Sequence, residues 1–444
     1  MQLKLSKVLL IVGLLSLALY GIYRTDIVQR NVEWKDMRNR VVGARLMKDG
    51  IAPYYHHWHP GDSLKYVMDL DIDTSHYRRT SACTASPFFH RAFIPIAGFD
   101  ESTIERGFFI FFYMLFAAMV CAMLYKSKQI IITLLFAVAF IFSDGWVMHI
   151  VVGQYYFIFG CLFFAIACLL MKNKHFLAGL LLAFLVLLRP NAVLFGVPFL
   201  FVILPYKRCF AGFALGILAY GLFAMSSPFE QKNWKEYSSS IKYYSQLHLD
   251  FLDKKTVKLE DASYNIDSLV PPVFEGSNLK ALAIQHTSTP ETQYFREQYN
   301  FYLAYKVIFK KAPSMLILNA LLAGGILFIM TVLFLKKRRD WNSFPLPSLL
   351  FSGLLMYELS CFFAGVTSFP YQMTQWFAGI ALMVIFYKKI PKVLFVLAFG
   401  AMVGNIVFMP VILGRHLFTE SLYLLTLFLI IMGHWKETRT DEGH

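Results

Sequence analysis

The segment EWKDMRNRVVGARLMKDGIAPYY, residues 33–55, combines side chains that could carry out a transfer reaction. Asp36 lies there among Arg38, Arg40 and Arg45. A carboxylate can accept the proton of an attacking hydroxyl group, and guanidinium groups bind phosphate. A simpler interpretation is that Asp36 only pairs with Arg40, four residues further along a helix. Asp26 is the alternative candidate for a base.

Three further residues have types and positions that suit ligand binding. Gln154, in HIVVGQYY, can both donate and accept hydrogen bonds with a sugar or a phosphate. Arg189, in LLRPN, follows an apolar hairpin and would either extend to the lipid headgroups or hold a phosphate. His149 is either a structural histidine or part of the same site.

The sequence predicts neither a metal nor a cofactor. The cluster YYHHWHP, residues 54–60, has three histidines within four residues, but it lies in a loop beside proline rather than at a helical spacing. If a divalent ion did bind, the first acids to test would be Asp69, Asp71 and Asp73. No phosphate-binding loop, dinucleotide fingerprint or nucleophile elbow is present, so a nucleotide-sugar donor is not expected.

The composition defines the elements that must position these residues. Of the 444 residues 57% are hydrophobic and only 16% are charged, and the mean hydropathy is +0.53. Apolar segments long enough to cross a bilayer recur along the chain, which indicates an all-α polytopic membrane protein. The net charge of +14 resides mostly in short loops between apolar runs, which argues against nucleic acid as a partner.

We predict about twelve transmembrane segments in one integral membrane domain, 1–444. The apolar runs are 5–23, 104–125, 129–143, 154–171, 175–188, 191–205, 208–225, 314–335, 346–366, 372–387, 392–409 and 417–433. Runs 129–143, 175–188 and 191–205 are short for a span and could be half-helices. With the N-terminus inside, every short basic cluster falls on the inner side, and so does the C-terminus. Segments 24–103 and 226–313 then form two ordered outer (periplasmic) loops.

The first outer segment is expected to contain interfacial helices. On a helix over residues 34–48, Trp34, Met37, Val41 and Ala44 form one apolar stripe flanked by charges. This pattern is typical of a helix lying in the membrane interface. Gly50 and Pro53 would end it.

Three motifs in this order resemble a known family. They are DMRNRVVGARLMKDGIAPYY, TASPFFHRAFIPIAGF, and the stretch from VVGQYY to VPFLF that contains LLRPN. Together they resemble the polyprenyl-phosphate-dependent glycosyltransferases of the GT-C superfold, and most of all glycosyltransferase family 87, the bacterial mannosyltransferase-like branch. The resemblance covers roughly residues 30–205.

The resemblance implies transfer of a mannose-like hexose from a polyprenyl-phosphate donor to a lipid- or glycan-linked acceptor. The reaction would take place on the outer face of the bacterial plasma (inner) membrane, among membrane lipids. It also implies Asp36 as general base and a set of residues that bind the donor phosphate or sugar: Arg189, Gln154, Arg45, Arg40, His149 and Tyr54. A lipid-linked glycan polymerase or ligase and a polytopic transporter or flippase remain the alternatives.

Overall fold

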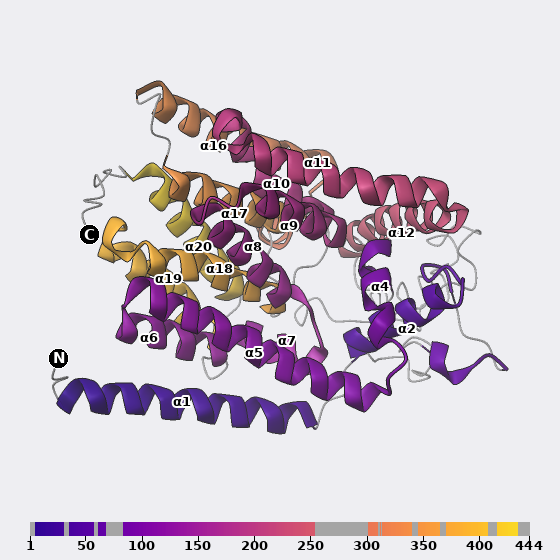
Figure 1. Ribbon diagram of the computed structural model, residues 1–444, viewed down its shortest axis with the longest axis horizontal. Helices are drawn as coiled ribbons and strands as arrows, with labels where there is room; N and C mark the ends of the chain where they lie inside the picture. The colour runs from indigo at the N-terminus through magenta and orange to yellow at the C-terminus, as the bar shows by residue number, and fades with distance from the viewer. Residues whose placement is uncertain are drawn as a thin grey trace.

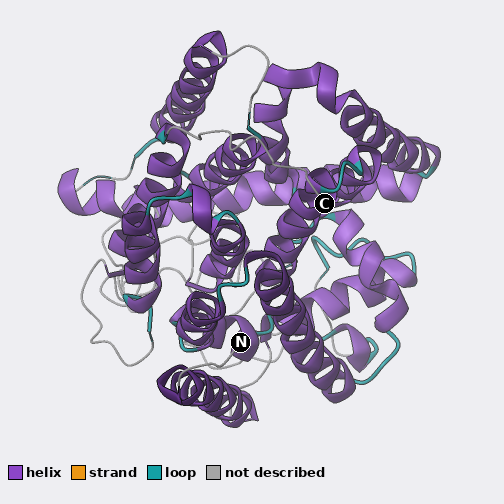
Figure 2. Ribbon diagram, turned by 60° about the vertical axis from the view of Figure 1, so that its left-hand side comes forward, coloured by secondary structure: helices purple, strands orange, loops and turns teal. Residues whose placement is uncertain are grey.

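The computed structural model describes residues 5–30, 35–56, 61–67, 83–253, 301–309, 311, 313–339, 345–364, 370–406 and 415–433. In this part of the chain every regular element is a helix, and one isolated bridge joins Ser143 and Ile406 (Figure 2). The predicted all-α fold is therefore confirmed for the residues described.

Most helices coincide with the predicted apolar runs (Figure 1). The α-helices are α1 Leu5–Arg30, α2 Lys35–Lys48, α4 Pro87–Phe93, α5 Glu101–Ser127, α6 Ile130–Ile141, α7 Asp144–Val152, α8 Tyr156–Met171, α9 His175–Leu188, α10 Val193–Gly196, α11 Ile203–Ser226, α12 Pro228–Asp253, α15 Phe301–Phe309, α16 Met315–Arg339, α17 Leu346–Phe362, α18 Trp376–Ile385, α19 Lys392–Val403 and α20 Arg415–Met432. The 3-10 helices are η1 Leu64–Tyr66, η2 Ile94–Ile96, η3 Pro190–Ala192, η4 Val197–Val202, η7 Pro370–Gln375 and η8 Tyr387–Lys389.

Five of these helices are long and apolar enough to cross a membrane: α1, α5, α11, α16 and α20. Helices α7 and α8 would make a sixth span if counted together, but they meet at a bend of 115°. Five shorter segments are apolar and 10–17 residues long. The multi-pass membrane character is clear from these helices, whereas the count of about twelve spans remains a prediction.

Helices α9 and α11 pack unusually closely through glycine. A Cβ on Gly179 would lie 1.9 Å from the carbonyl oxygen of Cys209, and one on Gly216 would lie 2.6 Å from the Cβ of Ala183. Small residues allow such close packing between membrane helices. The pair Gly179 and Cys209 is followed by the pair Ala183 and Gly216, so the residue numbers rise along both helices in the same direction. Helices α9 and α11 therefore run parallel. Residues 189–202 must therefore return along the bundle, and they do so through η3, α10 and η4, so the short run predicted at 191–205 is divided into several elements.

Helices α2, α4 and the beginning of α12 gather at one end of the long helices (Figure 1). The stripe of Met37, Val41 and Ala44 does not face a membrane interface, because all three side chains are buried in the main hydrophobic core. Val42 and Leu46, on another side of α2, are buried as well. Helix α2 is thus enclosed by protein, which corrects the interpretation of this stripe as interfacial. Trp34 lies outside the described residues.

Candidate active site

A glycine and a histidine fix the position of α2. A Cβ on Gly43 would lie 2.4 Å from Cε1 of His90 on α4, so only glycine lets the two helices approach this closely. The Nδ1–H of His90 donates to the backbone oxygen of Arg40 at 3.3 Å. Burial lowers the pKa of His90 to about 4, so the imidazole is neutral at physiological pH. Helix α4 therefore sets where Asp36 and Arg40 lie.

Gln154 joins Asp36 and Arg40 across more than a hundred residues of sequence. Helix α7 ends at Gly153, which has a φ of 70°, and the Gln154 backbone N–H then bonds the carbonyl of His149 at 2.9 Å. The amide nitrogen of the buried Gln154 side chain donates to Oδ2 of Asp36. Its amide oxygen accepts from Nη2 of Arg40 at 2.9 Å. Three residues predicted from sequence are thus brought together by the left-handed turn at Gly153.

The contacts of Asp36 differ from simple helix pairing. Arg40 donates from Nη1 to the backbone oxygen of Asp36 at 2.5 Å, and the described residues contain no ion pair between the two side chains. Oδ1 of Asp36 accepts no hydrogen bond from any described residue. Gln154 therefore holds the carboxylate through Oδ2, and Oδ1 can still accept a hydrogen bond or a proton.

Asp26 lies in a different environment. Its Oδ1 accepts from Nη1 of Arg106 at 3.0 Å, in an ion pair between α1 and α5. The Arg106 side chain is 52% exposed, so this pair contributes little to stability. Nothing in these contacts links Asp26 to Gln154 or to Arg189.

Two stacked tyrosines lie between Arg40 and Arg189. The guanidinium carbon of Arg40 is 4.3 Å from the ring centroid of Tyr155, and the rings of Tyr155 and Tyr156 stack at 5.2 Å. The guanidinium carbon of Arg189 is 4.6 Å from the Tyr156 ring. Tyr371 stacks on Tyr156 at 5.4 Å. We call Arg40, Tyr155, Tyr156 and Arg189 the arginine–tyrosine stack.

Arg189 follows α9, and neighbouring side chains orient its guanidinium. Nε donates to Oδ1 of Asn191 at 3.1 Å, and Nη2 donates to Sγ of Cys361 at 3.3 Å. Among the residues that the structure describes, Nη1 has no hydrogen-bond partner. Because Ser86 donates to the carbonyl of Leu187 at 2.7 Å, the end of α9 is also attached to the beginning of α4. The arginine is thus preoriented, and one nitrogen remains available for an anion.

The other predicted residues lie near this cluster without joining it. His149 is enclosed by aromatic rings, with Phe112 at 4.6 Å, and neither ring nitrogen has a hydrogen-bond partner in the described part of the chain. Arg45 donates to the backbone oxygens of Ala97 at 2.9 Å and Phe99 at 3.0 Å. The hydroxyl group of Tyr54 donates to the carbonyl of Ala85 at 2.8 Å.

Sequence reasoning missed several polar residues of the core. Glu358 and Glu420 are fully buried between α17 and α20, although their segments read as ordinary apolar spans. Trp376 is also buried, and its ring is stacked on that of Tyr423 at 4.5 Å. The two tyrosines of the arginine–tyrosine stack, Tyr155 and Tyr156, directly follow Gly153 and Gln154 in the sequence. This adjacency could have indicated them as site residues, but no role was assigned to them from the sequence.

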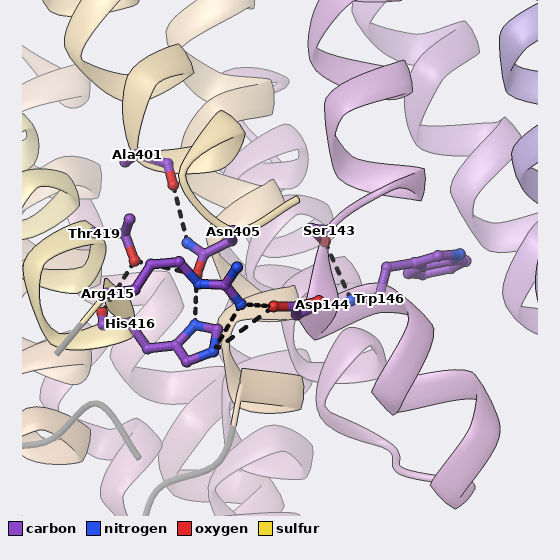
Figure 3. A network of polar contacts seen from close by, with 8 residues as sticks. All are labelled: Ser143, Asp144, Trp146, Ala401, Asn405, Arg415, His416 and Thr419. Atoms are coloured by element: carbon purple, nitrogen blue, oxygen red, sulfur yellow. Dashed lines mark hydrogen bonds and ion pairs between the residues drawn. The ribbon is translucent and has the colours of Figure 1, made fainter. Parts of the chain in front are cut away.

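A second polar network attaches the beginning of α7 to α19 and α20 (Figure 3). Arg415 donates to Oδ2 of Asp144, and the Nδ1 of His416 lies 2.7 Å from Oδ1 of Asn405. The backbone N–H of Asp144 donates to the Asn405 carbonyl at 2.6 Å. Because α7 ends at Gly153, this network fixes the helix that presents Gln154.

No metal-binding group of three or more histidine, cysteine or acidic side chains occurs among the described residues. The described residues do not include Asp69, Asp71, Asp73 or most of the histidine cluster 54–60. What we expect of a metal at these residues therefore stays a prediction.

The structure is that of a helical membrane protein. Its candidate site contains a carboxylate that Gln154 binds and guanidinium groups that neighbouring side chains orient. Residues 84–261 match glycosyltransferase family 87. The match agrees with the family that the motifs resemble and supports a glycosyltransferase activity, and it covers less than half of the chain. No curated protein and no solved structure matches the chain. The matched residues include Gln154 and Arg189, whereas Asp36 and Arg40 precede them.

Proposed function

We propose that the enzyme transfers a mannose-like hexose from a polyprenyl-phosphate donor to a hydroxyl group of a lipid- or glycan-linked acceptor. The observation that carries this proposal is the Asp36 carboxylate, which Gln154 holds through Oδ2 while Oδ1 has no partner among the described residues. The arginine–tyrosine stack connects this carboxylate to Arg189 through contacts of 4.3, 5.2 and 4.6 Å.

The chemistry follows from the two ends of this arrangement. Oδ1 of Asp36 accepts the proton of the acceptor hydroxyl while the hydroxyl oxygen forms a bond to C1 of the sugar. The bond between C1 and the phosphate oxygen breaks, and its electron pair leaves with the lipid phosphate. The guanidinium of Arg189 stabilises this developing negative charge through Nη1. The products are the glycosylated acceptor, the polyprenyl phosphate and one proton, which Asp36 releases to water.

The remaining predicted residues have supporting roles in this proposal. Arg40 and Gln154 orient the base. Arg45 and Tyr54, whose polar groups already bond backbone carbonyls, position the first outer segment. In this proposal His149, which packs against Phe112, contributes to the lining of the site. The reaction takes place on the outer face of a bacterial inner membrane, with both termini cytoplasmic; reagent labelling of cysteines introduced into 24–103 from the cytoplasmic side would contradict this orientation.

The donor class can be tested with purified protein in detergent that contains no lipid carrier. We expect transfer of hexose from a synthetic polyprenyl-phosphate hexose and none from the corresponding nucleotide sugar. The absence of any nucleotide-binding motif is the reason. Transfer from a nucleotide sugar without a carrier would refute the proposed donor.

A further inference from the structure

Helix α12, in the second outer segment, is anchored by a buried carboxylate. Glu230 is completely buried and accepts from Nε of Arg91 on α4 at 2.7 Å and from the hydroxyl of Tyr220 at 3.1 Å. Trp234 in turn donates to that hydroxyl at 3.1 Å. A buried charge with several donors fixes a helix in one place, since removing a partner would leave the charge uncompensated. The first turns of α12 are therefore held against α4 and α11.

The buried face of α12, which contains Glu230, has polar side chains, although a buried helix face is usually apolar. Asn233, Tyr237 and Ser240 follow at three, seven and ten residues from Glu230, which places them on the same side of the helix. Asn233 is 0% exposed, and neither its amide oxygen nor its amide nitrogen has a hydrogen-bond partner in the described part of the chain. Burying an amide without partners costs free energy, and a ligand hydrogen bond would offset that cost.

Tyr237 brings this face to the candidate active site. Its ring lies 5.5 Å from that of Tyr54 and 5.7 Å from that of Trp234. Its hydroxyl has no hydrogen-bond partner among the described residues. Tyr54 bonds the carbonyl of Ala85, and the adjacent Ser86 bonds the end of α9 just before Arg189, whose positive charge acts on the Tyr237 hydroxyl. Burial raises the pKa of Tyr237 to about 12, so the phenol keeps its proton at neutral pH and can donate a hydrogen bond.

We infer that Tyr237 is a ligand for the donor, its hydroxyl donating to a phosphate oxygen that the Arg189 guanidinium also binds. The inference rests on the proposed function and adds a specific role for the second outer segment. Helix α12 then forms one wall of the site, and the Arg91–Glu230 pair keeps that wall in place. A phosphate oxygen is the group that both a phenol and a guanidinium bind.

The test measures binding of undecaprenyl phosphate, without a sugar, to the full-length protein in detergent, from the ligand-dependent rise in Tm. Tyr237→Phe keeps the ring contacts with Tyr54 and Trp234 and removes only the hydroxyl. A hydrogen bond to a charged group is typically strong enough that its loss should raise the Kd about tenfold or more. Undecaprenol, which lacks the phosphate, should bind the variant and the native protein equally.

Two further variants separate the outcomes. Tyr55→Phe is the matched control, because its hydroxyl bonds Ser239 of α12 at 3.0 Å on an exposed part of the helix, and it should leave the Kd unchanged. Arg189→Lys should weaken phosphate binding. If Arg189→Lys weakens binding while Tyr237→Phe binds like the native protein, the inference about α12 is overturned and the proposed function stands. If neither substitution changes the Kd for undecaprenyl phosphate, both are overturned.

Discussion

Replacing Asp36 by asparagine separates its chemical role from its structural one. The side-chain oxygen of asparagine can still accept from Gln154, as Oδ2 does in the native protein. The atom that replaces Oδ1 becomes an amide nitrogen, which cannot take a proton from the acceptor. The substitution therefore removes the base and keeps the shape of α2.

The expected loss of rate is large. A positioned general base contributes roughly 100- to 10,000-fold, which corresponds to about 2.7–5.4 kcal/mol of transition-state stabilisation. If Asp36 only held α2 in place, the variant would lose at most one weakened hydrogen bond, about 1 kcal/mol of stability, and turnover would persist. Initial rates with a polyprenyl-phosphate hexose, together with the Tm, distinguish the two cases. We expect turnover to fall at least a hundredfold with a Tm close to the native value.

Asp26→Asn is the control for this experiment. Asp26 pairs with Arg106 at 3.0 Å on α1 and α5, and its loss should leave the rate near the native value. Abolished transfer in Asp26→Asn with normal transfer in Asp36→Asn would show that the wrong acid was assigned. Normal transfer in both variants would refute the base mechanism.

Two further predictions concern how α4 holds α2. Gly43→Ala should lower the free energy of unfolding by about 1–3 kcal/mol and reduce turnover, because the new Cβ would lie 2.4 Å from His90. Thermal denaturation measures this loss. Gly98→Ala is the control and should leave the stability unchanged, because a Cβ there meets nothing within 4 Å. His90 has a folded-state pKa of about 4 against an ordinary value of 6.5, so the unfolded state binds the extra proton between these values. Stability from the neutral imidazole is complete above about pH 6.5 and should decline by up to about 3 kcal/mol as the pH falls toward 4. Tm measured between pH 7.5 and 5 should show this decline, and a pH dependence that persists undiminished in His90→Gln would contradict the assignment.

The sequence was sufficient to predict most of the apolar helices, because apolar runs are local signals. The bounds of α8 and α9 differ from the predicted runs by no more than two residues. The candidate base and its partner just after α7 could be named for a similar reason, since Asp36 and Gln154 lie within recognisable motifs.

Tertiary contacts were beyond sequence reasoning. Nothing in the pattern of α2 showed that protein would enclose its apolar stripe, because a protein core and a membrane interface select the same residues. The parallel packing of α9 on α11 requires the chain to return between them, but nothing in the pattern of 191–205 showed that η3, α10 and η4 would divide this return. The burial of Glu358 and Glu420 likewise depends on helices that are far apart in the chain.

The most direct test of the central claim is a structure of the Asp36→Asn variant with a polyprenyl-phosphate hexose and an acceptor bound. The account predicts the phosphate within hydrogen-bond distance of Nη1 of Arg189, and the acceptor hydroxyl about 2.6–3.2 Å from the side chain at position 36. An acceptor hydroxyl bound beside Asp26, or a donor phosphate remote from Arg189, would contradict it.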